Sequence, residues 1–483
     1  MIRLDVILAI ARAEGRLTRR LVRYWVFLVL AWGFGILGYV NYAFILHARF
    51  SAYSATVAAI NPRYLVALYG TWYLLIFLIG LVFLGFDIRA RDVRERIVEV
   101  LDSKPFSNIE LILGRFVGLL VMSWLPVALI TLFLFGLGLA FDEPIEPYSL
   151  IDFAVFMAIP AFMFTLGLVF LTSILVKFRL LTVVIVGGLL VGATFGGQLI
   201  RVDLGGLIAV TGGFQVGYSS DFVHFGAGFF GFAQRIAYAL AGITLALLAA
   251  ALHPRLDGGS RGRRLGAVGV TAALTVMMFG LNLGSTRTYI NGTEMWQAAH
   301  EARRNDPGPD ILAMNAFAGI DPGDALNLEV ELRFAAPPDH TLERALFSLN
   351  PGLEVSGVVD AEGRETNFTF EDGLLEIDLP RPLGPGEETV VSVTAGGFPL
   401  ENFAYLDAVK NVLTVQSRDA GLFLLGFQPM MFSSGYVALM PGARWLPASG
   451  SEVGRGDSDL RPVDFYELEL TVELPEDWQY PAR

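Results

Sequence analysis

The chain has 483 residues, no cysteine, a hydrophobic content of 54% and a mean hydropathy of +0.55. These values exclude an ordinary soluble domain and a disulfide-stapled scaffold, and they indicate a membrane protein. Residues 1–283 carry a net charge of +7, and the remainder carries −19. The two parts therefore belong to different environments.

The N-terminal 23 residues predict an amphipathic helix on the cytosolic side of the membrane. Their apolar run is short and is interrupted by Asp5, whereas a strong basic cluster directly precedes the first long apolar stretch. A secretory signal peptide has its basic residues before the apolar run. We therefore expect residues 1–23 to be an uncleaved lead-in helix.

Residues 24–283 predict a membrane α-helical bundle of six to seven transmembrane helices. Each apolar stretch has about the length that a helix needs to cross a bilayer of roughly 30 Å. The stretches are 24–46, 64–86, 116–141, 153–176, 180–200, 229–252 and 265–283. The sixth is the weakest of them, because Arg235 lies in its first turns.

The basic loops give the orientation of this bundle. Residues 89–115, 177–179 and 255–264 are rich in arginine and lysine, whereas the loop at 142–146 is acidic. Because positively charged loops face the cytosol, the N-terminus is expected there and everything after about residue 284 is expected outside. The sequence thus predicts a multi-pass protein of the plasma membrane or bacterial inner membrane.

A charged amphipathic segment, residues 87–115, follows the second apolar stretch. Its apolar positions fall on one helical face, namely Val93, Ile97, Val100 and Leu101. Its charged positions fall elsewhere, at Arg91, Arg94, Glu95 and Glu99. Pro105 ends this helix, and Ser107 and Glu110 have the spacing of a capping box for the next one. The sequence predicts an elbow at the membrane surface.

Two features of the spans bear on transport. No Asp, Glu, Lys or His lies near the middle of any span, which disfavours a proton- or sodium-coupled antiporter. Gly188, Gly192 and Gly196 form a small-residue stripe that permits close helix contact. The contact is either an interface between subunits or packing within one bundle.

The C-terminal part changes to a period of two. After a linker at 284–320, which includes a short helix at 293–304, residues 321–483 contain alternating apolar and polar runs separated by Gly-, Pro- and Asn-containing turns. The clearest runs are 326–334, 375–379, 390–393 and 466–474. We expect an extracytoplasmic, mainly antiparallel β domain.

The segment from Glu99 to Pro105, followed by Ser107-Asn108 and Leu113-Gly114-Arg115, resembles type-2 ABC exporter permeases. The resemblance implies a cytosolic coupling helix that docks in a cleft of an ATPase. The residues that it places at that contact are Arg91, Arg94, Glu95, Glu99, Asp102 and Pro105. Because the sequence has no GxxxxGK[ST] motif, the ATPase would be a separate polypeptide. The alternative is an interfacial helix without a partner.

Residues of roughly 320–480 are similar to the N-terminal β domain of the aminopeptidase N family, notably at 346–358, 379–387, 440–445 and 464–478. The similarity stops where the catalytic zinc domain of that family would begin. Zinc binding there requires HExxH, but the sequence offers His300-Glu301 with Arg304 in the second histidine position. We therefore expect no catalytic residue, metal or cofactor, and we expect His300 at the surface of a polar helix.

These observations favour a permease subunit of an ABC-type exporter. Its expected partners are an ATPase subunit in trans, a second permease in a homodimer or heterodimer, and the lipid bilayer, but no nucleic acid. Two alternatives remain open. The chain is either a fragment or split half of a membrane-tethered zinc aminopeptidase, or a non-transporting anchor that displays a binding domain outside the cell.

Overall fold

The computed structural model describes most of the chain. The described residues are 3–41, 45, 66–86, 105–140, 150–176, 178–196, 204, 207–211, 228–255, 257, 260–400, 402–403, 406, 430–432, 434, 437–439, 441–453, 465–476 and 478. They form two compact units, Met1–Thr286 and Arg287–Arg483. Each unit is described by itself below.

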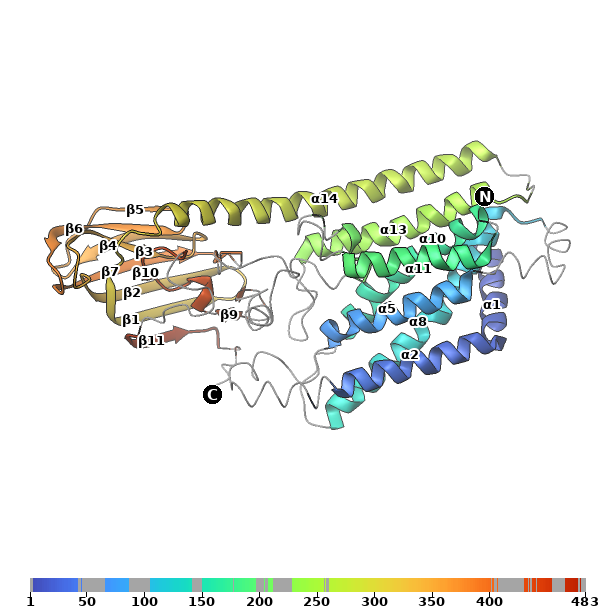
Figure 1. Cartoon of the computed structure of the whole chain (residues 1–483), viewed down its shortest axis with the longest axis horizontal. Coiled ribbons are helices and arrows are strands. Elements are labelled where there is room, and N and C mark those ends of the chain that lie inside the picture. Colours follow the sequence, from blue (N-terminus) through green and yellow to red (C-terminus); the bar gives the residue numbers. More distant parts are fainter. Residues whose placement is uncertain are drawn as a thin grey trace. The chain divides into compact units, whose positions relative to one another are not determined.

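The first unit is a helical bundle (Figure 1). Its helices are α1 (Leu4–Arg20), α2 (Val22–Val40), α5 (Val66–Gly85), α8 (Asn108–Ala140), α10 (Ala158–Leu175), α11 (Arg179–Gly196), α13 (Gly228–Leu252) and the part of α14 (Arg261–Ala302) that precedes Arg287. A π-helical turn, Asp152–Met157, leads into α10. Each of the seven apolar stretches in the sequence thus overlaps a described helix.

Four of these helices are long and apolar enough to cross a membrane. They are Asn108–Ala140, Phe153–Leu175, Gly231–Leu252 and Arg261–Ser285. Helices α1 and α2 pass the same test together but are bent by 75° at their junction, and the apolar parts of α5 and α11 are shorter. The described residues therefore give four helices that could cross a membrane, or five with the bent pair, and the expected six to seven transmembrane helices remain a prediction.

Aromatic side chains fill the centre of the bundle. Tyr73 and Phe77 of α5 contact each other edge to face at 4.9 Å between ring centroids, and Phe77 lies 6.3 Å from Phe162 of α10. Helices α10 and α13 approach most closely where Gly167 faces Gly242, because a Cβ at either position would collide with the backbone of the other helix. Glycine at both positions lets these two helices pack as one pair.

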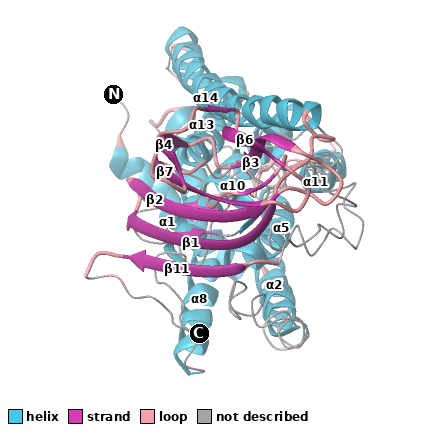
Figure 2. Cartoon of the chain, turned by 90° about the vertical axis from the view of Figure 1, so that its left-hand side faces the viewer, coloured by secondary structure: helices cyan, strands magenta, loops and turns pink. Residues whose placement is uncertain are grey.

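The second unit is built on two β-sheets. The strands are β1 (Asp310–Asp321), β2 (Ala325–Ala335), β3 (Leu342–Ser348), β4 (Leu353–Asp360), β5 (Phe368–Glu371), β6 (Leu374–Leu383), β7 (Glu388–Gly397), β8 (Met430–Phe432), β9 (Val437–Leu439), β10 (Ala448–Ser449) and β11 (Glu467–Glu473). One sheet has the order β11-β1-β2-β7-β4 (Figure 2). The other has the order β10-β3-β6-β5, while β8 and β9 pair separately. Every pairing is antiparallel except that of β11 with β1, so the expected mainly antiparallel domain is confirmed.

The period-two pattern explains the core of this unit. Along β2, Leu328, Val330 and Leu332 are buried, whereas the alternate side chains Glu329 and Glu331 are exposed. Strand β11 departs from this pattern because all seven of its residues are exposed. It lies at the edge of the sheet, where its apolar side chains have a strand on only one side.

The region expected to be a linker has more structure than its sequence indicated. Helix α14 runs without interruption to Ala302, and β1 begins at Asp310. No proline occurs between residues 261 and 302, and Gly284 and Gly292 are accommodated within the helix. The expected short helix at 293–304 is thus the end of α14.

His300 is fully buried, so the expectation of a surface position was wrong. Its Nδ1 accepts a hydrogen bond from the backbone N–H of Glu452 at 3.0 Å, and its Nε2 lies 3.0 Å from the carbonyl oxygen of Asp372. A neutral imidazole with its proton on Nε2 satisfies both contacts. The ring also packs edge to face against Phe403.

Burial lowers the pKa of His300 below its ordinary value, against smaller opposing effects of the Asp372 carbonyl and the Glu452 carboxylate. The unfolded chain therefore takes up a proton as the pH falls below about 6.5, while the folded domain resists it. We expect the contribution of His300 to the free energy of unfolding of the C-terminal unit to be fully present above that pH and to be lost as the pH falls below it. The measurement is chemical unfolding of the full chain in detergent at pH 7.5 and pH 5.5. The readout is the susceptibility of the C-terminal unit to proteolysis at each denaturant concentration.

His300→Phe removes the titrating group and preserves an aromatic ring. We expect this variant to be less stable at pH 7.5, because the Glu452 N–H loses its acceptor, but to lose less stability than the parent between the two pH values. An unchanged difference between the two pH values would assign the pH dependence to other groups.

Candidate functional site

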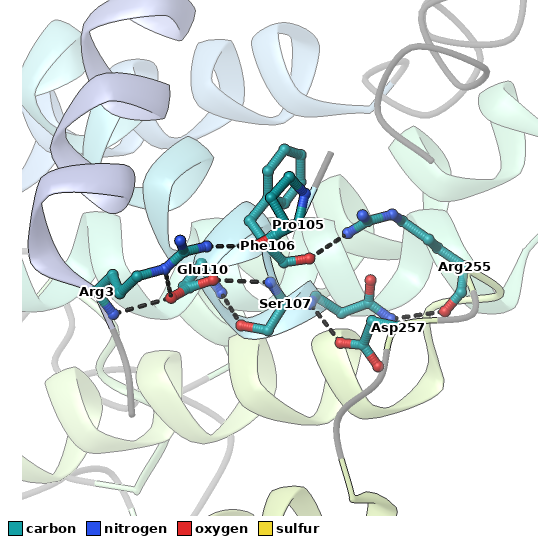
Figure 3. A network of polar contacts seen from close by, with 8 residues as sticks. Arg3, Pro105, Phe106, Ser107, Glu110, Arg255 and Asp257 are labelled. Carbon is teal, nitrogen blue, oxygen red and sulfur yellow. Dashed lines mark hydrogen bonds and ion pairs between the residues drawn. The ribbon is translucent and has the colours of Figure 1, made fainter. Parts of the chain in front are cut away.

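The segment that leads into α8, residues 105–110, is called the elbow below, and it is built on a capping box. The Oγ of Ser107 accepts a hydrogen bond from the N–H of Glu110 at 3.2 Å, and the Oε2 of Glu110 accepts one from the N–H of Ser107 at 2.7 Å. The reciprocal pair satisfies amides that the first turn of a helix leaves free. The structure therefore confirms the helix start that the sequence predicts, immediately after Pro105 (Figure 3).

Arg3 ties the start of α1 to the same carboxylate. Its backbone N–H donates to the Oε1 of Glu110 at 2.9 Å, and its Nε lies 3.4 Å from that oxygen. The guanidinium also donates to the carbonyl oxygen of Pro105. Glu110 is nearly buried, with 4% of its side chain exposed, so these donors replace much of its water.

A third segment, the connection between α13 and α14, closes the other side of the elbow. The guanidinium of Arg255 donates to the carbonyl oxygen of Phe106 at 2.8 Å and lies 4.5 Å above the centre of its ring. Asp257 accepts a hydrogen bond from the N–H of Asn108 at 2.7 Å (Figure 3). It also forms an ion pair with Arg264. An acidic group at this position also complements the positive end of the α8 dipole.

Helix α1 packs directly along the first turns of α8. A Cβ at Gly114 would lie 2.6 Å from the Cβ of Ile10, and a Cβ at Gly118 would lie 2.6 Å from the carbonyl oxygen of Ala11. Beside this contact, Glu14 and Arg115 form a buried ion pair with 3.8 Å between Oε2 and Nε. The two helices are thus held together by close backbone packing and by paired charge.

The elbow contains only part of the residue set expected to contact an ATPase. Pro105 is among the described residues, and its carbonyl oxygen accepts a hydrogen bond from the guanidinium of Arg3. The other five, Arg91, Arg94, Glu95, Glu99 and Asp102, lie outside the described residues, as does the expected amphipathic helix itself. Their role therefore stays a prediction.

The expected glycine stripe on α11 does not pack within the described bundle. A Cβ at Gly188 or Gly192 would meet no described atom within 4 Å. Gly196 is the last residue of α11, and its contacts are not among those described. Close glycine-mediated packing occurs instead between α10 and α13 and between α1 and α8. A role for the stripe between subunits remains a prediction.

Hydrogen bonds to nearby groups explain how the charge of Arg235 is accommodated in the apolar helix α13. Its guanidinium donates to the carbonyl oxygens of Val210 at 2.9 Å and Ala209 at 2.7 Å, and its Nε donates to Gln234 at 2.7 Å. Tyr238, one turn along α13, donates to the carbonyl oxygen of Leu207 at 2.9 Å. These side chains hold the short segment 207–211 against α13, so the charge in this span is hydrogen-bonded to backbone.

Several residues of the elbow were not identified from the sequence. Arg3, Arg255 and Asp257 come from segments far from residue 107 in the chain, so no local pattern indicates their contacts. A signal for the α1–α8 contact was present, because Gly114 and Gly118 are four residues apart on one helical face. Among the described residues, no group of three His, Asp or Glu side chains has the arrangement of a metal site.

No family model matches the sequence, and no curated protein matches it. Among solved structures, an M1 zinc metallopeptidase from Deinococcus radiodurans is 25% identical, with a TM-score of 0.18, over 19% of this chain and 21% of that chain. A mutant of a two-domain M1 zinc metallopeptidase bound to L-arginine is 20% identical, with a TM-score of 0.25, over 34% of this chain and 32% of that chain. The chain thus spans about a third or less of these structures, and a likeness of this size assigns no activity.

The capping box gives a direct test of the elbow. Ser107→Ala removes the side-chain acceptor for the Glu110 N–H, and we expect it to cost about 1 kcal/mol of helix stability. Hydrogen exchange of peptides covering 105–116 should become faster. Ser107→Thr retains the oxygen and serves as the control. Equal exchange in the parent and the alanine variant would show that the box does not stabilise the start of α8.

The α1–α8 contact is tested by a matched pair of glycine substitutions. Gly118→Leu places a side chain against the α1 backbone, whereas Gly136→Leu, in the same helix, meets no described atom within 4 Å of its Cβ. We expect Gly118→Leu to be less stable than Gly136→Leu by about 1–3 kcal/mol. Thermal unfolding in detergent, followed by circular dichroism, measures the difference, and coinciding curves would contradict the contact.

Proposed function

We propose that the chain is the membrane-spanning permease subunit of an ABC-type exporter. A separate ATPase subunit binds the cytosolic segment 91–102 and supplies the energy. The permease forms a dimer, with itself or with a homologous subunit, in the plasma or inner membrane. The N-terminus is cytosolic, and the β domain is extracytoplasmic.

The observation that supports this proposal is the construction of the elbow. The start of α8 is joined to α1 through Glu110 and to the α13–α14 connection through Arg255 and Asp257. A force applied to the chain just before Pro105 therefore reaches α8 at a rigid point. A bundle that only anchors a domain has no need for a reinforced lever at its cytosolic surface.

The bundle also offers a way for this force to produce movement. Pro126 lies within α8 and removes one backbone hydrogen bond there, which gives the helix a place to bend. The α10–α13 pair is locked by Gly167 and Gly242. When the ATPase closes on ATP, the start of α8 moves with the coupling segment, and α8 tilts relative to that pair to open an outward path.

The composition of the spans supports one class of substrate. The spans carry few ionisable side chains, and the charge of Arg235 is occupied by backbone carbonyls. A hydrophobic or amphipathic substrate therefore suits this bundle better than an ion does. The alternative of a split zinc aminopeptidase gains nothing from His300, because both ring nitrogens contact the domain itself.

Affinity purification of the full chain in mild detergent tests this function. We expect an ATPase subunit with a GxxxxGK[ST] motif to co-purify, and the complex to hydrolyse ATP. Replacing Arg94, Glu95 and Glu99 together by alanine should abolish the association while the size-exclusion profile of the permease stays the same.

The control exchanges charges elsewhere in the chain. Arg333→Gln and Glu331→Gln alter two exposed residues of β2, and the ATPase should remain bound. Unchanged ATPase recovery with the triple alanine variant would reject the coupling mechanism. Absence of any ATPase in the complex, with normal substrate efflux after loss of the chain, would favour the anchor alternative.

A further inference from the structure

Helix α1 has a second face that the elbow does not use. Its buried face, which includes Ile7, Ala11 and Glu14, packs in the bundle, mainly along α8. The opposite side of the helix carries four exposed arginines: Arg12, Arg16, Arg19 and Arg20. At 3.6 residues per turn, these four lie within about a third of the helix circumference. We call this set the arginine row.

The arginine row is strongly positive and has no partner in the described part of the chain. None of its four guanidinium groups forms a hydrogen bond or ion pair with a described residue. The two acidic residues of α1 do not neutralise the arginine row. Glu14 is buried against Arg115, and Asp5 lies in the first turn, at the end of the helix far from the row. Within the described part of the chain, the arginine row therefore has no acidic partner.

Two exposed leucines flank the arginine row. The side chains of Leu4 and Leu8 are 72% and 49% exposed. On the helical wheel they lie between the arginine row and the buried face. An amphipathic helix of this kind, with basic groups beside exposed apolar ones, fits the boundary between headgroups and acyl chains.

The junction with α2 bears on the depth of this face in the proposed membrane orientation. Helices α1 and α2 meet at 75°, so α1 lies close to the membrane plane when α2 crosses the bilayer. Trp25, in the first turn of α2, is exposed and donates its indole N–H to the carbonyl oxygen of Arg19 at 2.8 Å. Tryptophan concentrates at membrane interfaces, so this contact sets the arginine row at headgroup depth.

We infer that the arginine row with Leu4 and Leu8 is a binding surface for anionic phospholipid headgroups of the cytosolic leaflet. Guanidinium groups pair with phosphate oxygens through forked hydrogen bonds, and the leucines insert at the acyl boundary. This inference rests on the membrane orientation proposed above and not on the ATPase. An acidic protein surface would satisfy the arginines but would give no reason for exposed leucines on the membrane side.

Lipid binding at this surface bears on the elbow. Helix α1 reaches α8 through Arg3 and Glu110 at one end and through Glu14 and Arg115 further along. A headgroup held by the arginine row restrains the outer face of the same helix. Anionic lipid therefore stabilises the position of α1 against α8, and thermal stability rises with the fraction of anionic lipid.

The test is a titration of the detergent-purified full chain with short-chain phosphatidylglycerol or phosphatidylcholine, with bound lipid measured by native mass spectrometry. We expect preferential binding of phosphatidylglycerol that weakens as salt is raised. Arg12→Gln with Arg16→Gln should weaken it by about tenfold, since each basic residue adds to attraction by anionic lipid. This pair leaves Arg19 and Arg20 in place to preserve topology.

Two further variants separate charge from folding. Arg12→Lys with Arg16→Lys preserves the charge and should retain most of the binding. Arg333→Gln with Arg381→Gln removes the same charge from the β unit, where both residues are exposed, and should leave binding unchanged. Equal binding by the parent and the Arg12→Gln, Arg16→Gln variant, or equal loss in the β-unit control, would overturn the inference.

Competition distinguishes other sources of the same chemistry. Inorganic phosphate at the concentration of the lipid should not displace phosphatidylglycerol, because it has no acyl chain to contact Leu4 and Leu8. Equal displacement would overturn a lipid site. If the Arg12→Gln, Arg16→Gln variant keeps its lipid affinity but no longer recovers an ATPase, the surface serves a protein partner and the inference is wrong. Failure of ATPase recovery in the parent leaves the lipid titration unaffected.

Discussion

The carboxylate of Glu110 is the point on which the end of the bundle at the start of α8 depends. It accepts from the backbone of Ser107 within its own helix and from Arg3 at the start of another. A carboxylate with so little exposure is costly unless donors replace its water, and here they come from two segments. Because both must be in place at once, the start of α8 and the start of α1 are positioned together.

Backbone carbonyls perform a similar task deeper in the bundle. Arg235 brings a charge into an apolar helix, yet its N–H groups donate to the backbone carbonyls of Ala209 and Val210. The cost of burying each group is thus offset by the other. The same logic applies to His300, whose two nitrogens join three chain segments in the C-terminal unit. In each case a polar side chain specifies which pieces of backbone lie together.

Periodicity alone was sufficient to predict the two kinds of fold and the capping box at Ser107 and Glu110, because these are local properties of the chain. It was not sufficient for contacts between distant segments. His300 lies in a polar helix, and its burial depends on Asp372 and Glu452, which no helical pattern reveals. The alternating pattern of β11 predicts a half-buried strand, but the strand is exposed because it lies at the edge of its sheet. The regular spacing of the glycines on α11 predicts close packing there, whereas the described bundle glycines whose Cβ would meet the backbone of another helix are Gly114, Gly118, Gly167 and Gly242.

The parallel pairing of β11 with β1 has a consequence for biosynthesis. Strand β1 pairs with β2 as soon as the next few residues are made, but its other edge waits for residues 467–473, which the ribosome adds only after the other described strands. During that interval the nascent sheet exposes a row of free N–H and C=O groups, a known route to misassembly. Completion of this sheet is therefore a late event, and a chaperone that shields the open edge of β1 would act in that interval.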